Sequence, residues 1–158
     1  MSLLPFIEWC NKLWIGEVIR KSTWLFPLVE TIHLLGLALL LGTILIVNMC
    51  ALGAIMRGRS ISHVATQLAT WTYSGLFVML ATGVLLFASE PMKCYESPPF
   101  RVKMIAFLLA VVYQLTIYRK LTKSDEIRSN YAGSGALAGI SLLLWFGVAL
   151  AGRAIGFY

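Results

Sequence analysis

Glu30 and His33 stand one turn apart at the start of a long apolar segment, PLVETIHLLGLALLLGTIL, which begins at position 27. A carboxylate beside an imidazole can orient the ring toward a metal, share a proton with it, or simply hydrogen-bond to it. The next charged residue is Arg57, so residues 31–56 are uncharged when His33 is neutral. That length is enough to cross a bilayer, and ionisable groups at the mouth of such a helix indicate a polar contact or a site.

Lys103 and Arg101 introduce positive charge at the start of another apolar segment. At helical spacing Ala110 and Gln114 lie on the same side as Lys103, whereas Arg101 points nearly opposite and can extend to the headgroups. Lys103 is therefore the better candidate for a buried polar site. Its alternative role is that of a membrane-surface anchor.

Arg153 lies near the end of the last apolar segment. Counting back from it in helical phase gives Ala149, Phe146, Leu142, Gly139 and Gly135. Because small residues four apart mark faces where membrane helices pack closely, this stripe predicts that Arg153 points inward. There it could bind a haem propionate or a lipid phosphate through its guanidinium, or form an ion pair with Glu30.

The composition indicates what kind of element positions these residues. Of 158 residues, 59% are hydrophobic and 13% charged, and the mean hydropathy is +0.81. Soluble domains average about 45–50% apolar and about 25% charged residues, so this is an integral membrane protein. The net charge of +6 then serves headgroup anchoring and topology, and the chain has no basic, aromatic-rich stretch suited to nucleic acid. The three cysteines form no Cys-x-x-Cys motif, which argues against c-type haem attachment and a zinc framework.

The predicted fold class is all-α: an integral membrane four-helix up-down bundle with an N-terminal interfacial helix. An interfacial segment at 1–21 is followed by spans at about 24–56, 63–88, 99–120 and 131–155, in a single transmembrane domain over 1–158. An even number of spans places both termini on one side. Basic residues in the loops are nearly balanced and lean toward termini on the periplasmic side of a bacterial inner membrane.

With this topology Glu30, His33, Lys103 and Arg153 all lie near the same membrane face and are expected to share a polar pocket. His63 follows the opposite turn, about 30 residues from His33. At about 1.5 Å per residue that separation is most of a bilayer, so a bis-histidine haem within one chain is disfavoured.

Other residues of the spans have two interpretations each. Gln67, Thr70 and Ser74 are in phase on the second span and either line a cavity or hydrogen-bond to a neighbouring helix. Trp71 and Trp145 lie deeper than the other tryptophans and either flank a porphyrin or pack in the core. No hydrolase motif or phosphate-binding loop is present in the sequence.

A resemblance to a known group of proteins is carried by three segments: ETIHLLGLALLLGTI, GLFVMLATGVLLFASEPMKCYESPPFRVKM and LLLWFGVALAGRAIGFY. They resemble an uncharacterised family of small four-helix bacterial membrane proteins in the copper-resistance-D-like superfamily, which includes members that bind b-type haem. HemJ-type protoporphyrinogen oxidases of that superfamily are similar in having four helices, a first-helix His matched here by His33, and an essential Lys matched loosely by Lys103. Relatives often carry Asp-Leu-Arg where this chain has Val47-Asn48-Met49, and a His where Tyr118 stands, so a second set of haem ligands is missing here.

The resemblance implies b-type haem or porphyrin chemistry. We expect one haem b with His33 as its metal ligand, Glu30 orienting the imidazole, Arg153 on one propionate, and Lys103 on the second propionate or the distal side. The expected task is electron relay between a partner dehydrogenase or cytochrome, membrane-bound or periplasmic, and the quinone pool. The alternatives are a non-enzymatic accessory subunit of a respiratory or photosynthetic complex, in which His33 only locks helices together, and a HemJ-like oxidase.

Overall fold

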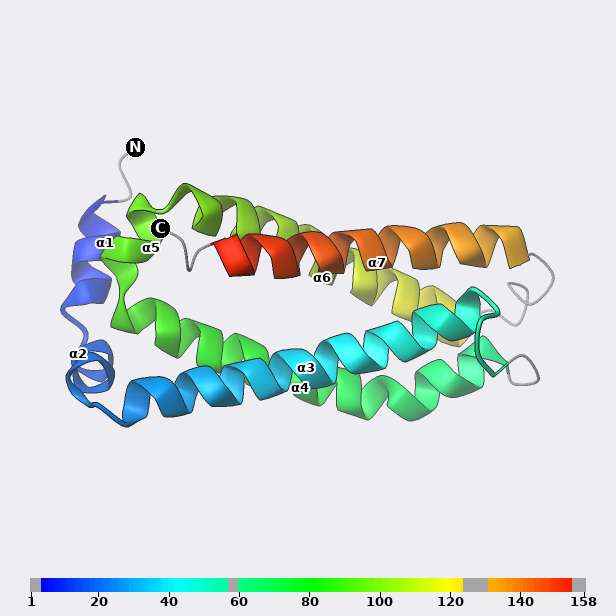
Figure 1. Ribbon diagram of the computed structural model, residues 1–158, viewed down its shortest axis with the longest axis horizontal. Coiled ribbons are helices and arrows are strands. Elements are labelled where there is room, and N and C mark those ends of the chain that lie inside the picture. Colours follow the sequence, from blue (N-terminus) through cyan, green and yellow to red (C-terminus); the bar gives the residue numbers. More distant parts are fainter. Residues whose placement is uncertain (1–3, 57–59, 124–130, 155–158) are drawn as a thin grey trace.

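The computed structural model describes residues 4–56, 60–123 and 131–154, without the side chains at 4, 6, 118–123, 131–134, 153 and 154. Within these ranges all regular structure is helical (Figure 1). The helices in chain order are α1 (Leu4–Asn11), α2 (Trp14–Lys21), α3 (Leu25–Ala51), α4 (Ile61–Ser89), α5 (Pro91–Glu96), α6 (Pro98–Lys123) and α7 (Tyr131–Ala154). The predicted all-α class is confirmed for the described residues.

Four of the described helices are long and apolar enough to cross a membrane. They are Leu25–Ala51, Ile61–Ser89, Pro98–Ile117 within α6 and Gly135–Gly152 within α7. Their positions agree with the four predicted spans to within a few residues, except at the end of the first. The chain is thus a multi-pass membrane protein by the length and hydropathy of its helices.

The first span ends earlier than predicted because a glycine stops the helix. Gly53 has φ +69°, a left-handed conformation that glycine adopts without steric cost. Its N–H bonds to Cys50 O at 3.0 Å, and Ala54 N–H bonds to Met49 O at 2.9 Å. These two bonds form a Schellman motif, which satisfies carbonyls of the last helical turn. The predicted end at residue 56 is therefore wrong, and α3 ends at Ala51.

The connection between the second and third spans contains the short helix α5, which begins at the buried Pro91. The next proline pair, Pro98 and Pro99, opens α6 close to the predicted start of the third span at residue 99. Together α1, α2 and α5 lie at the end of the molecule opposite the α3–α4 turn (Figure 1).

The long helices form two closely packed pairs, α3 with α4 and α6 with α7. The backbones of α3 and α4 approach each other closely at Gly75. A Cβ on Gly75 would lie 3.0 Å from Leu40 N and 3.1 Å from Gly36 O. Only glycine permits this approach, and the small residues let the helices gain van der Waals contact along their length.

The two pairs contact each other through different kinds of side chain along their length. One cluster joins Leu40 and Ile44 of α3 to Ala110 of α6 and to Trp145 and Val148 of α7. By contrast, residues 25–35 of α3 and 98–109 of α6 include no buried side chain. Figure 1 shows the pairs diverging toward the end that carries α1, α2 and α5. At the His33 end the pairs meet instead through half-buried side chains, such as the stacked rings of Phe87 on α4 and Phe100 on α6, whose centroids are 5.8 Å apart.

Candidate functional site

His33 is held on α3 by a hydrogen bond to α4. Its Nδ1 lies 2.9 Å from Thr82 Oγ1. The Thr82 hydroxyl donates its one hydrogen to Val78 O at 2.6 Å, so toward His33 it can only accept. Nδ1 therefore carries the hydrogen, and Nε2 of the neutral ring keeps its lone pair. This is the tautomer that a metal-ligating histidine has when a second group orients it.

The imidazole lies over a glycine of α4, because a Cβ on Gly83 would be 3.4 Å from Cε1 of His33 and 3.9 Å from Nδ1. The ring is half-buried, so it is neither sealed in the core nor fully exposed. Thr82 and Gly83 together define both the direction and the plane of the ring.

Glu30 is exposed, and among the described contacts it has no hydrogen bond to His33. The orienting bond that we predicted for Glu30 is made by Thr82. Glu30 and Lys103 both remain within electrostatic range of the imidazole. Sequence reasoning missed Thr82, although its hydroxyl, seven residues before the end of α4, is in reach of the same membrane face.

Lys103 is half-buried on α6, and its side chain crosses Gly152 of α7. The position of a Cβ on Gly152 would be 3.5 Å from Lys103 Cε and 3.6 Å from Nζ. In the described part of the chain no acceptor bonds to Nζ and no carboxylate pairs with it. Lys103 is thus a half-buried amine whose hydrogen-bonding capacity is unused among the described residues.

The predicted phases of α6 agree with the structure. Ala110 and Gln114, expected on the side of Lys103, are buried. Arg101 is exposed, donates to Tyr95 O at 2.8 Å and lies 5.1 Å above the Tyr95 ring. The two cations at the start of α6 therefore have different roles, as their spacing indicated.

The stripe that we predicted for α7 is wrong. Phe146 is 65% exposed, Ala149 is exposed, and a Cβ on Gly139 would meet nothing within 4 Å. The buried face comprises Ala138, Ser141, Trp145 and Val148. An apolar face serves lipid and protein alike in a membrane helix, so hydrophobicity alone does not identify the packed side. The side chain of Arg153 lies outside the described residues, and its predicted role stays a prediction.

Polar side chains on α4 also fall on the opposite sides from those expected. Gln67, Thr70 and Ser74 are exposed, and therefore line no internal cavity. The buried hydroxyl residues of α4 are Thr72, Thr82 and Ser89. His63 is exposed in the first turn of α4, where its backbone N–H bonds to Ser60 Oγ at 3.1 Å.

The two deeper tryptophans have different environments. Trp71 is 59% exposed on the outer side of α4, so it flanks no internal site among the described residues. Trp145 is 4% exposed and meets Phe107 edge to face, with ring centroids 6.2 Å apart. For Trp145 the packing interpretation is the one that the structure supports.

Cys94 lies on α5, outside the four long apolar segments, and is half-buried. Burial raises the pKa of its thiol, and the nearby Glu90 carboxylate raises it further, while the charge of Lys103 acts in the opposite direction. Cys94 is thus close to Lys103. No group of three or more His, Cys, Asp or Glu side chains in the described part of the chain could hold a bare metal ion.

Comparison with known proteins gives one family match. A family of unknown function, DUF6644, matches residues 6–158. No curated protein and no solved structure matches the chain. The resemblance to the copper-resistance-D-like superfamily therefore stays a prediction.

Proposed function

The chain belongs to the DUF6644 family, and we propose that it is a membrane-embedded up-down helix bundle that binds one b-type haem through His33 and relays electrons. The observation that carries this proposal is the hydrogen bond between His33 Nδ1 and Thr82 Oγ1. It leaves Nε2 as a lone-pair donor of fixed direction. A haem protein needs such a nitrogen for the axial position.

The residues present fit a haem better than a bare metal ion. A porphyrin supplies four of the iron ligands, so one imidazole is enough to hold it, whereas a protein-only site needs three or four side chains. Bound haem would supply a one-electron redox centre. The chain's part is to present Nε2 from α3 and keep the ring orientation through Thr82.

Lys103 supplies the charge that an anionic ligand at this end of the bundle requires. Its Nζ has no acceptor in the described part of the chain and lies on the neighbouring helix pair from His33. A propionate bonded to Nζ would satisfy it. We propose that Arg153, whose backbone lies one residue beyond Gly152 on α7, also binds a propionate. Glu30 would act on the imidazole of His33 through its negative charge.

The low burial of α3 and α6 at this end favours a ligand site there. Residues 25–35 and 98–109 include no buried side chain, so both segments have side-chain surface that a ligand could cover. A flat ligand that contacts both segments would add apolar burial to them. Electrons would pass from a membrane or periplasmic partner through this site to the quinone pool of the bacterial inner membrane.

An absorption spectrum tests the proposal directly. We expect protein purified in mild detergent to show a Soret band that shifts on reduction with dithionite, either as isolated or after addition of hemin. His33→Ala should abolish the band, and the matched control His63→Ala, which changes the exposed histidine at the far end of α4, should retain it. A Soret band of wild-type intensity in His33→Ala, or a wild-type protein that takes up no hemin, would overturn the proposal.

A second function is favoured by the outer face of α4. Gln67, Thr70 and Ser74 are exposed on a membrane-spanning helix, where an amide facing lipid is costly and a polar neighbour stabilises it. This favours an accessory subunit of a larger respiratory or photosynthetic complex. A colourless protein that co-purifies with a defined membrane partner, and loses that partner on Gln67→Leu, would support the second function over the first.

A further inference from the structure

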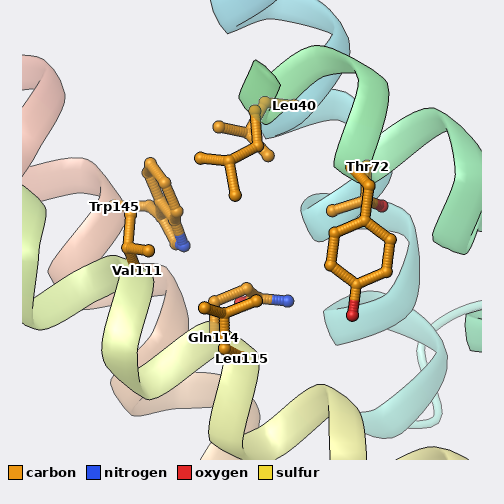
Figure 2. A pocket seen from close by; sticks show the side chains of 8 residues that line it. Leu40, Thr72, Val111, Gln114, Leu115 and Trp145 are labelled. Atoms are coloured by element: carbon orange, nitrogen blue, oxygen red, sulfur yellow. The ribbon is translucent and has the colours of Figure 1, made fainter. Parts of the chain in front are cut away.

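A cavity lies between the two helix pairs, deeper in the bundle than His33. Figure 2 shows side chains from four helices around it: Leu40 of α3, Thr72 of α4, Val111, Gln114 and Leu115 of α6, and Trp145 of α7. Leu40 follows His33 by about two turns, so the cavity is about 10 Å farther along α3. It is therefore separate from the proposed haem site.

Trp145 brings an unsatisfied donor to this cavity. The residue is 4% exposed, and its Nε1 has no hydrogen-bond partner among the described residues. In Figure 2 the indole nitrogen points toward the space enclosed by the lining side chains. A buried N–H without an acceptor costs about 1–3 kcal/mol, and lipid acyl chains have no acceptor to offer it. An acceptor at this point would remove that cost.

Gln114 brings a second donor from the adjacent helix. Its Oε1 accepts from Ser141 Oγ at 3.1 Å, and Ser141 Oγ in turn accepts from Asn48 Nδ2 at 3.0 Å. The carbonyl end of the amide is thus used, and Figure 2 shows its nitrogen on the cavity side. Two neutral N–H donors then approach one space whose lining contains no charged residue. This arrangement calls for a neutral oxygen acceptor rather than an anion.

The size of the cavity identifies the acceptor. It has about 10 Å³ of room for the centre of a water-sized sphere. A buried water needs roughly 10–15 Å³ by this measure and two to four polar partners. A quinone ring or an acyl chain would require the lining side chains to move.

We propose that this cavity binds a single water molecule, which accepts hydrogen bonds from Trp145 Nε1 and Gln114 Nε2. The water extends the chain Asn48–Ser141–Gln114 to Trp145 and so links α3, α6 and α7 near the middle of the membrane. It is bound whether or not haem binds at His33.

Nuclear magnetic resonance of the full chain in nanodiscs of deuterated lipid tests this site. With ¹⁵N-labelled tryptophan, we expect the Trp145 Nε1–H signal to show a cross peak to water. Trp71 is the matched control, because it adjoins the cavity-lining Thr72 at the same depth but is exposed on the outer side of α4. Its indole signal should show no cross peak to water.

The signals are assigned by Trp145→Phe and, should that variant not fold, by elimination with Phe substitutions of the other tryptophans. Gln114→Leu removes one partner of the water and should weaken the Trp145–water cross peak at least twofold while the Trp71 signal stays unchanged. A Trp145 signal without a water cross peak in the wild-type protein would overturn the proposal. So would the loss of that cross peak on addition of decylubiquinone, since the cavity would then take a carbonyl in place of water.

Discussion

The imidazole of His33 on α3 and the hydroxyl of Thr82 on α4 are joined by a 2.9 Å hydrogen bond in which the imidazole donates. The direction follows from Thr82, whose own hydrogen goes to Val78 O. One hydroxyl therefore determines both the tautomer and the orientation of the only imidazole at this end of the bundle. This relationship connects helix packing with the proposed chemistry.

Thr82→Val should weaken both the packing and the proposed ligand site. It keeps the side-chain shape but removes the hydroxyl that accepts from His33 Nδ1–H, and interhelical hydrogen bonds in membranes are worth about 0.6–2 kcal/mol. We expect a lower thermal unfolding midpoint and about 10–100-fold weaker haem binding, as for loss of a group that orients a ligand. Hemin titration measures the second effect. Thr82→Ser, which restores the hydroxyl, should recover most of both losses, and equal haem binding by the valine and serine variants would contradict the assigned role.

Gly75→Ala should destabilise the α3–α4 pair. Its Cβ would lie 3.0 Å from Leu40 N and 3.1 Å from Gly36 O, and backbone atoms cannot move aside as a flexible side chain can. We expect a loss of about 1–3 kcal/mol in the free energy of unfolding, typical of overpacking. Gly147→Ala is the control, because a Cβ there meets nothing within 4 Å. Unfolding in mixed micelles measures both, and a Gly75→Ala variant as stable as Gly147→Ala would show that the helices do not cross so closely.

Ser141→Ala should break the buried polar chain between the helix pairs. Asn48 Nδ2 would lose its acceptor and Gln114 Oε1 its donor, both in a buried setting. We expect a loss of about 1–3 kcal/mol, because two buried polar groups are left unsatisfied. Thr116→Ala serves as the control, since that exposed hydroxyl bonds only to Val112 O of its own helix. Equal unfolding midpoints for the two variants would contradict the importance of this chain.

Labelling of Cys94 should depend on pH and on Lys103. Burial and Glu90 raise the pKa of the thiol, so less thiolate is present at neutral pH and maleimide labelling should accelerate as the pH rises above the ordinary thiol range. Lys103→Gln removes a charge that lowers the pKa of Cys94, so labelling at a given pH should slow. Lys93→Gln should slow it less, because Lys93 is the weaker of the two influences.

The labelling is measured with Cys10 and Cys50 replaced by alanine, so that only Cys94 reacts. Faster labelling in Lys103→Gln would show that the ammonium does not face the thiol. The protein that retains only Cys94 also tests the predicted orientation of the chain in the membrane. A membrane-impermeant maleimide should reach Cys94 from the periplasmic side of intact cells, and labelling only after lysis would reverse the topology.

Much of the secondary structure could be predicted because the constraints are local. A span needs about 20 apolar residues, and the positions of charges and prolines mark where each begins and ends. The start of α6 at Pro98 follows from such a signal. Gly53 is an equally local signal for the end of α3. The uncharged run extends past it to residue 56, however, so the end of the helix was predicted too late.

The site was predicted only in part. The sides of α6 on which Lys103 and Arg101 lie were correct, because a polar residue inside a membrane helix has few favourable positions. The packed side of α7 was wrong, since Phe146 and Trp145 are equally apolar and the choice between them depends on the neighbouring helix. The partner of His33 was also misplaced, because the adjacent Glu30 was close in sequence while Thr82 is close only in space.

The amino-acid sequence by itself determined the number of candidate spans, their approximate bounds and the position of each ionisable residue along its helix. Hydropathy and helical rise depend on the chain alone. The tertiary structure decided which faces meet, that Thr82 orients His33, and that Trp145 turns its N–H into a cavity. Those outcomes depend on close approach at residues such as Gly75, and in lipid, where every face is apolar, only shape and hydrogen bonding distinguish one helix face from another.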